Sequence, residues 1–155
     1  KNKPYMKKFL FLAIMLMTLT YCKKNVDCST PPPDFILLVN KNSELYKEFI
    51  NQEGKIDKAS IFFYKQVGNE KKQYDIVFDT FKPENNNDYL QIIISLWFEN
   101  DVYTGKTETL YLQNATKTYK IEVNGYMKDT DCGLVPITNE IYVDGVKVEN
   151  HYLAK

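Results

Sequence analysis

Apolar residues recur at every second position in several short stretches of this chain, and this pattern constrains the fold more than any other feature. In DYLQIIISLWFE, residues 88–99, one set of alternate positions is wholly apolar: Leu90, Ile92, Ile94, Leu96 and Phe98. Side chains of an extended strand point alternately to opposite faces, so this period indicates a strand with one face in a core. An amphipathic helix would instead place apolar residues three and four apart.

Similar stretches, rich in aromatic and β-branched residues, follow one another with turn sequences between them. They are residues 35–39, 59–67, 74–81, 107–113, 116–124, 141–143 and 146–148. The last two flank Asp144-Gly145, which is a strong hairpin signal. We therefore predict an all-β fold of about eight strands, an immunoglobulin-like antiparallel β-sandwich in preference to a small barrel.

One short segment departs from the alternation. Ser43 follows a polar turn and could cap a helix near residues 43–52, in which Leu45 and Phe49 lie four apart. A strand followed by a loop also fits these residues. We expect no more than one short helix, at this position.

The first residues differ from the rest of the chain. Residues 9–21 form an uncharged apolar run of 13 residues after a pair of lysines, whereas a helix that spans a bilayer core needs about 20. A basic start, a short apolar middle and a polar boundary are typical of a secretory signal peptide. We predict a signal peptide over residues 1–21, in which Met6 is the initiator and residues 1–5 lie upstream.

The motif LTYC, residues 19–22, resembles the lipobox of bacterial lipoproteins, in which the cysteine takes a diacylglycerol thioether and becomes the new N-terminus. Tyr21 departs from the pattern, because the family prefers Gly, Ala or Ser there. The resemblance implies a lipid anchor at Cys22 with more than one acyl chain, such as palmitate, which is what stable anchoring takes. A tether over residues 22–33 and a domain over residues 34–155 would follow. An uncleaved short anchor and ordinary secretion are the alternatives.

The longer stretch YCKKNVDCSTPPPDFILLVNKNSELY, residues 21–46, resembles the start of small lipoproteins of the Bacteroidota. These open with a signal that ends in Cys-Lys-Lys, a second cysteine, a proline-rich step and an extended strand. The resemblance implies an envelope location and a β-sandwich, and it carries no catalytic residue. We expect a lipid-anchored protein of the outer membrane, on its periplasmic side or at the cell surface.

The other two cysteines suit an exported protein. With Cys22 lipidated, Cys28 and Cys132 remain as an even pair, which indicates a disulfide in an oxidising compartment. This bond would join the tether to the far end of the domain and close a loop of about 100 residues. Two unpaired thiols are the alternative. No metal site is expected, because these cysteines and the distant His151 lack the close spacing of zinc ligands.

Charge narrows the classes of partner. Sixteen of the 20 lysines and all 20 acidic residues follow Tyr21, so the chain without its leader has a formal charge of −4. Nucleic acid requires clustered positive charge, and no nucleic-acid partner is therefore expected. The sequence contains no arginine, so it lacks the bidentate fork that holds phosphate or carboxylate.

The sequence offers no catalytic constellation. His151 is the only histidine, and no nucleophile is implied beside it. Four carboxylates could pair as acid and base, although a solvent-facing position on a sheet is the simpler interpretation: Asp75, Asp79, Glu99 and Asp101. Residues 129–133 are interpreted as a turn in preference to a calcium loop. We predict a non-enzymatic protein without a cofactor, and a hydrolase is the third hypothesis.

Aromatic residues suggest the binding surface. Trp97, Tyr89 and Tyr64 are the candidates for an exposed platform that stacks a sugar or a peptide, and core packing is the alternative role for them. The leading hypothesis is a lipid-anchored module that binds a glycan or a protein partner, or supports one structurally. The runner-up is a small lipocalin-like barrel that holds an apolar ligand.

Overall fold

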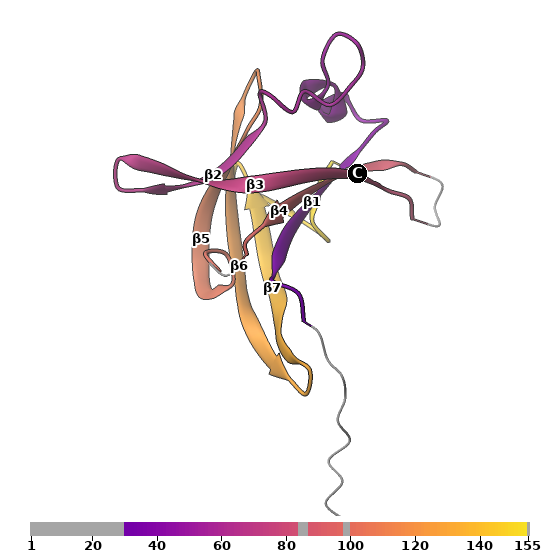
Figure 1. Cartoon of the computed structure of the whole chain (residues 1–155). Coiled ribbons are helices and arrows are strands. Elements are labelled where there is room, and N and C mark those ends of the chain that lie inside the picture. Colours follow the sequence, from indigo (N-terminus) through magenta and orange to yellow (C-terminus); the bar gives the residue numbers. More distant parts are fainter. Residues whose placement is uncertain (1–29, 84–86, 98–99, 155) are drawn as a thin grey trace, which may run out of the picture.

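The computed structural model describes residues 30–83, 87–97 and 100–154, and within these ranges the chain forms nine strands and one 3-10 helix (Figure 1). The predicted signal peptide, Cys22 and Cys28 lie outside the described residues. In chain order the elements are β1 (Asp34–Asn40), η1 (Glu44–Phe49), β2 (Phe62–Val67), β3 (Glu70–Phe81), β4 (Tyr89–Ser95), β5 (Thr104–Gln113), β6 (Thr118–Thr130), β7 (Gly133–Val143), β8 (Val146–Val148) and β9 (Tyr152–Ala154).

The strands of the described ranges belong to one hydrogen-bonded sheet with the order β8-β7-β6-β5-β2-β3-β4-β1-β9. Neighbouring strands are antiparallel except β1 and β9, which run parallel. β3 is shared by two halves of the sheet, because residues 70–74 pair with β2 and residues 75–81 pair with β4. The predicted all-β class is confirmed.

The two edge strands of this sheet are neighbours in sequence. β8 ends at Val148 and β9 begins at Tyr152, so only residues 149–151 carry the chain from one edge to the other. The sheet must curl until its edges approach, and Figure 1 shows the strands wrapping toward a barrel. The immunoglobulin-like sandwich stays a prediction. The same order of strands fits a sheet that curls into a barrel and a sheet that folds into two packed halves.

The core lies inside the curl and is filled by alternate side chains of the central strands. Those that are 0% exposed include Phe35, Leu37, Phe63, Ile92, Ile94, Leu110, Leu112 and Ile121. The rings of Phe35 and Phe63 lie 5.9 Å apart between centroids. Full burial of such a side chain contributes about 1.5–3 kcal/mol relative to exposure. The inside of the curl is therefore packed with apolar side chains.

The alternation in the sequence gives the correct faces. On β4, Leu90, Ile92 and Ile94 are buried in the core, as predicted. On β6, Tyr119, Ile121 and Val123 are buried as well, while the intervening lysine and glutamate point outward. The period of two therefore identifies the buried side of these strands without any further information.

Several boundaries differ from the sequence prediction. The strand expected over residues 88–99 ends at Ser95, because Trp97 adopts a φ of 49°, in the left-handed region that strands do not use. The turn interpreted over residues 129–133 is shorter than expected, and residues 134–140, to which the sequence assigned no element, belong to β7. Only residues 131 and 132 turn the chain between β6 and β7. The three-residue strand β9 was not expected at all.

Two local predictions are confirmed. The short helix η1 occupies Glu44–Phe49, and the Ser43 hydroxyl caps it by accepting the Tyr46 amide at 3.3 Å. The helix is of the 3-10 type. Asp144-Gly145 forms the β7–β8 turn with φ values of 50° and 81°, as a type I′ hairpin requires.

Candidate functional site

A hollow beside Trp97 is the first of two candidate binding sites. It has a volume of about 310 Å³ and is lined by Lys72, Gln73, Tyr74, Asp75, Ser95, Leu96 and Trp97. We call it the Trp97 shelf. β3 and β4 supply its floor, since Asp75 and Ser95 are partners in the β3–β4 pairing. Lys72, Gln73, Asp75 and Ser95 provide donors and acceptors around a single large aromatic ring.

The indole of Trp97 is presented to solvent and fixed at one edge. The residue is 58% exposed, although tryptophan is usually highly buried. Its Nε1–H donates to Asp75 Oδ2 at 3.3 Å. Its φ of 49° is strained for a bulky residue, and strain of this kind concentrates at functional sites. The turn after β4 therefore holds the indole outward, with its Nε1–H bonded to Asp75.

A half-buried ion network adjoins the shelf. Lys72 Nζ lies 2.5 Å from Asp101 Oδ2, and the Tyr74 hydroxyl donates to the same carboxylate at 2.7 Å. Lys65 Nζ lies 2.6 Å from Glu108 Oε2 and also donates to the Asp101 carbonyl oxygen at 3.3 Å. Each of these four charged side chains is 19–35% exposed.

The network lowers the pKa of both carboxyl groups. Burial alone would raise the pKa of Asp101, but the hydrogen bonds and charge of Lys72, with the Tyr74 hydroxyl, bring it below the usual range. Burial opposes ionisation of Glu108 in the same way, and Lys65 with the Thr104 hydroxyl brings its pKa below the usual range. The lowered pKa values favour the ionised, paired form of both carboxyl groups, and Lys72 and Tyr74 connect this network to the lining of the shelf.

The three aromatic candidates from the sequence are not equally exposed. Tyr64 is 7% exposed and stacks on Tyr111 with centroids 5.2 Å apart, while Lys71 lies over its ring. Tyr89 is 4% exposed and meets Tyr152 edge-on. Of the three, only Trp97 presents its ring to solvent and lines the shelf. Sequence alternation could not separate them, because the sequence placed all three in predicted strands, whereas in the structure Trp97 lies in the turn after β4.

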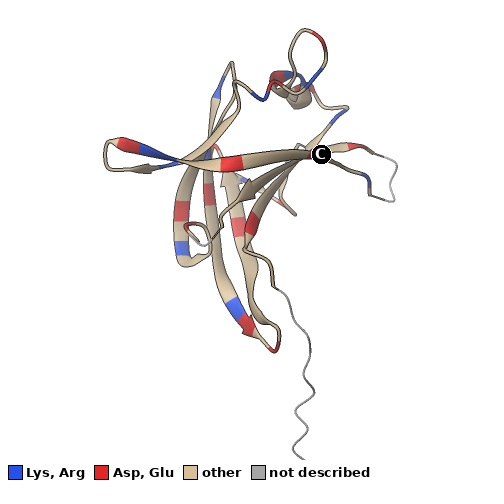
Figure 2. Cartoon of the chain, viewed as in Figure 1, with Lys and Arg blue, Asp and Glu red and all other residues tan. Residues whose placement is uncertain are grey.

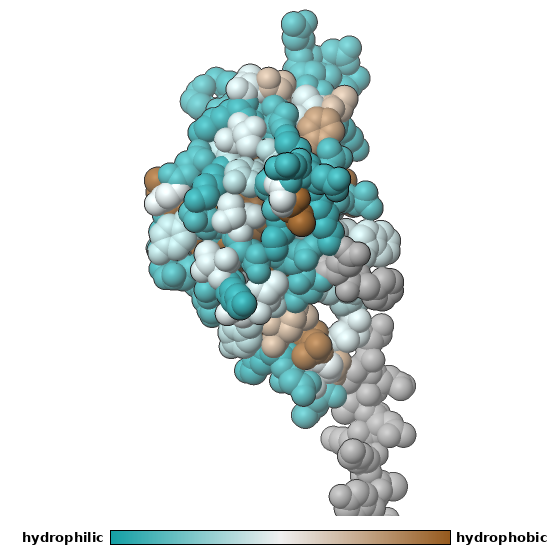
Figure 3. All heavy atoms as spheres, turned by 90° about the vertical axis from the view of Figure 1, so that its left-hand side faces the viewer, coloured by the Kyte–Doolittle hydropathy of each residue, from teal (hydrophilic) through white to brown (hydrophobic). Residues whose placement is uncertain are grey.

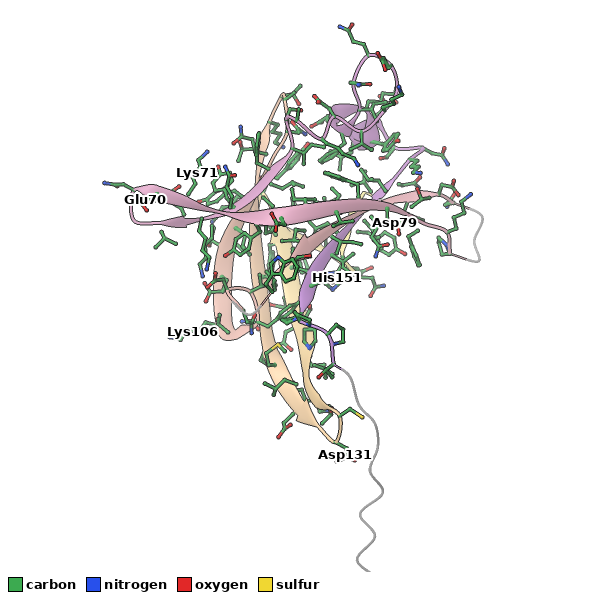
Figure 4. The ribbon with its side chains drawn as sticks, in the orientation of Figure 1. Glu70, Lys71, Asp79, Lys106, Asp131 and His151 are labelled. Carbon is green, nitrogen blue, oxygen red and sulfur yellow. The ribbon has the colours of Figure 1, made fainter. Side chains whose placement is uncertain are left out.

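The structure also shows where three of the four carboxylates considered for a hydrolase lie. Asp75 holds Trp97 and Asp101 belongs to the ion network, while Asp79 lies on the outer face of β3 (Figure 4). Glu99 lies outside the described residues. Within those residues, no group of three or more His, Cys, Asp or Glu side chains is arranged to hold a metal ion.

A groove along the seam of the curled sheet is the second candidate site. Its volume is about 520 Å³, and we call it the seam groove. It lies between the outer face of β1 and the middle of β7, on the opposite face of β1 from Phe35 and Leu37. Its lining is formed by Asp34, Ile36, Leu38, Phe81, Gln91, Tyr103, Pro136, Ile137, Thr138, Asn150 and His151.

Tyr103 lines this groove, and its ring packs against Gly125. The Tyr103 hydroxyl donates to the Asp34 carbonyl oxygen at 3.2 Å, and burial raises the pKa of this tyrosine. A Cβ placed on Gly125 would lie 2.9 Å from the Tyr103 ring and 2.7 Å from the Ile137 carbonyl oxygen. The ring therefore needs the glycine in order to pack between β1 and the β6–β7 hairpin. No sequence signal pointed to these two residues.

The tip of the β6–β7 hairpin meets the start of the described chain. Cys132 is disulfide-bonded, and a Cβ on Gly133 would lie 2.9 Å from the Thr30 hydroxyl oxygen. Asp131 marks this tip in Figure 4. Cys28, only two residues before Thr30, lies outside the described residues, so its pairing with Cys132 stays a prediction. The closeness of Thr30 and Gly133 supports that pairing.

The remaining surface is polar and mixed in charge. Figure 2 shows lysines and acidic residues interspersed along the strands, and Figure 3 shows one face with hydrophilic residues dominant and apolar residues scattered. Among the described residues, none of the helical structure is both long and apolar enough to cross a membrane. The described residues as a whole define a small all-β domain with external hollows and a packed interior.

Comparison with known proteins adds no assignment to this description. The chain matches no protein-family model, no curated protein and no solved structure.

Proposed function

We propose that this protein is a non-enzymatic carbohydrate-binding module, anchored in the outer membrane by lipid at Cys22. The observation that carries the sugar-binding proposal is the exposed, backbone-strained and hydrogen-bonded indole of Trp97. An aromatic face can stack on the apolar face of a sugar ring, while nearby polar side chains bond its hydroxyl groups. The Trp97 shelf offers both elements over about 310 Å³.

The shelf favours a sugar over an apolar ligand. Four of the residues that surround the ring carry polar side chains that can bond hydroxyl groups: Lys72, Gln73, Asp75 and Ser95. The curl of the sheet fits the runner-up, a lipocalin-like barrel, but that function needs an apolar chamber inside the sheet, where this protein has its core. We therefore place the glycan on the outside of the sheet.

Trp97 is the only tryptophan, so its fluorescence reports directly on the shelf. The probes are soluble β-linked oligomers of glucose and of N-acetylglucosamine, first on an array and then in fluorescence titrations. We expect saturable binding with a shift of the indole emission. Trp97→Gly should weaken binding at least tenfold in calorimetry while leaving the fold intact, because glycine accepts the φ of 49°. Unchanged affinity in this variant would contradict the proposal.

The matched control is Tyr126→Ala, which removes an aromatic ring that is 39% exposed on β6. It should leave sugar affinity unchanged. A protein that binds none of the oligomers, or that loses affinity equally in both variants, has no sugar site at Trp97.

Lipid anchoring needs its own test, because Cys22 lies outside the described residues. Cys22→Ser should move the protein from the membrane fraction to the soluble fraction of cells that express it. Metabolic labelling with a palmitate analogue should mark the native chain and not the variant. Unchanged membrane retention without label would overturn the anchor and leave the sugar proposal untouched.

A further inference from the structure

Two strand edges border the seam groove without a strand between them. β9 pairs with β1 only at Leu38 and Val39, and β8 pairs with β7 only at residues 141–143. Within the described ranges, residues 34–37 of β1 and 133–140 of β7 therefore have a strand on one side alone. Such edges present backbone N–H and C=O groups that can pair with another extended chain.

Side chains and one backbone carbonyl group of the same chain already occupy some of the edge positions of β1. His151 Nδ1 lies 2.8 Å from the Ile36 carbonyl oxygen, and the Leu38 amide donates to the His151 carbonyl oxygen at 2.9 Å. The Tyr103 hydroxyl donates to the Asp34 carbonyl oxygen. These bonds show that the backbone groups of alternate β1 residues point into the groove, and an added strand would take the place of the His151 and Tyr103 side chains at the Ile36 and Asp34 carbonyl oxygens. Figure 4 shows His151 beside β1 at this position.

The lining of the groove also indicates which side chains a bound segment would carry. Ile36, Leu38, Phe81, Pro136 and Ile137 make its lining largely apolar. The acidic residues on it and on the adjoining hollow are Asp34, Glu140 and Glu149, against the single lysine Lys147, which lies 2.7 Å from Glu140. Figure 2 shows acidic residues on both bordering strands. The charge therefore complements a basic ligand.

We propose that the seam groove binds an extended segment of a partner protein by strand addition, a segment in which apolar residues alternate with lysine or arginine. Six successive antiparallel pairings separate β7 from β1, so these two strands run in the same direction. A segment antiparallel to both would continue the alternating order of the sheet. This site is separate from the Trp97 shelf and does not depend on it.

The probe is the synthetic peptide acetyl-Lys-Val-Lys-Val-Lys-Val-amide, titrated into isotope-labelled protein and followed by backbone amide chemical shifts. We expect saturable changes confined to residues 34–38 and 136–138, apart from Pro136, which has no amide proton. The same peptide with its three valine amides N-methylated keeps every side chain and charge, and it should bind at least tenfold more weakly. Equal binding of the methylated peptide, or shift changes centred elsewhere, would overturn strand addition.

Two variants and one further measurement complete the test. Ile36→Arg places a cation in the groove and should weaken peptide binding at least tenfold, whereas Val77→Arg, at a residue 53% exposed on β3, should leave it unchanged. Thr138→Arg on the opposite wall replaces Ile36→Arg if circular dichroism shows that the first variant is unfolded. Sedimentation without peptide should give a monomer. A dimer abolished by the groove variant would mean that a second copy occupies the site, contrary to the proposal.

Discussion

The imidazole of His151 lies 2.8 Å from the carbonyl oxygen of Ile36, 115 residues earlier in the chain. A carbonyl oxygen can only accept, so Nδ1 carries the proton and donates it. The ring also lies against Phe35 with centroids 5.8 Å apart. One histidine therefore fastens the last corner of the chain to its first strand, which gives the only histidine of the sequence a structural role.

This corner leads to a prediction about stability. His151→Ala removes the ring donor and keeps a φ of 64°, which alanine disfavours. We expect the free energy of unfolding to fall by about 1–3 kcal/mol. His151→Asn should lose less, because asparagine tolerates the left-handed region and its amide can donate. Urea unfolding of the three proteins measures the order. An alanine variant as stable as the native protein would contradict the role of this bond.

The disulfide at Cys132 gives a second prediction. We expect peptide mapping under non-reducing conditions to join Cys132 to Cys28, and Cys132→Ser to lower stability by about 2–4 kcal/mol, since a bond between these two residues would close a loop of about 100 residues. Cys22→Ser is the control and should leave both the map and the stability unchanged. A bond between Cys22 and Cys132 would refute both the pairing and the lipid anchor.

The ion network beside the shelf predicts a loss of stability in acid. The pKa values of Asp101 and Glu108 lie below their usual range in the folded protein. Their contribution is therefore complete above the unfolded pKa values of about 4, and it is lost as the pH falls through the folded ones. The double variant Asp101→Asn with Glu108→Gln should flatten the dependence of the urea midpoint between pH 5 and pH 2.

The control for the acid experiment is Glu44→Gln. The Glu44 side chain is 87% exposed in its ion pair with Lys47, so it contributes little. Its pH dependence should match that of the native protein. If the double variant keeps the full native slope in acid, the network does not contribute as described.

Gly125 supplies a fourth prediction. Alanine there would bring a Cβ to 2.7 Å from a backbone oxygen of β7, an atom that cannot move aside as a flexible side chain can. We expect Gly125→Ala to destabilise the protein by about 1–3 kcal/mol. Tyr126→Ala, one position along β6, should change stability much less because its ring is 39% exposed. Thermal unfolding compares the two, and equal midpoints would contradict the close packing at Gly125.

Local patterns predicted much of the fold and little of the sites. Alternation identified the buried faces of β4 and β6, and Asp-Gly identified the last hairpin, because each signal acts over a few neighbouring residues. The seam groove depends on residues 34–38 and residues 136–138 lining one hollow although they are far apart in the sequence, and no local period encodes such an arrangement. The sequence predicted Trp97 as a candidate binding residue. It could not predict that the ring is exposed, because this exposure depends on the turn that ends β4.

The three-residue corner between β8 and β9 also bears on how the chain folds during synthesis. Ribosomes release a chain from its N-terminus, so of the described strands β1 emerges first and its neighbour β9, with Tyr152 and Ala154, emerges last. Before β9 pairs with β1, both edge strands of the incomplete sheet can pair with other chains. In a chain with this order of strands, the sheet is therefore complete only after β9 has left the ribosome.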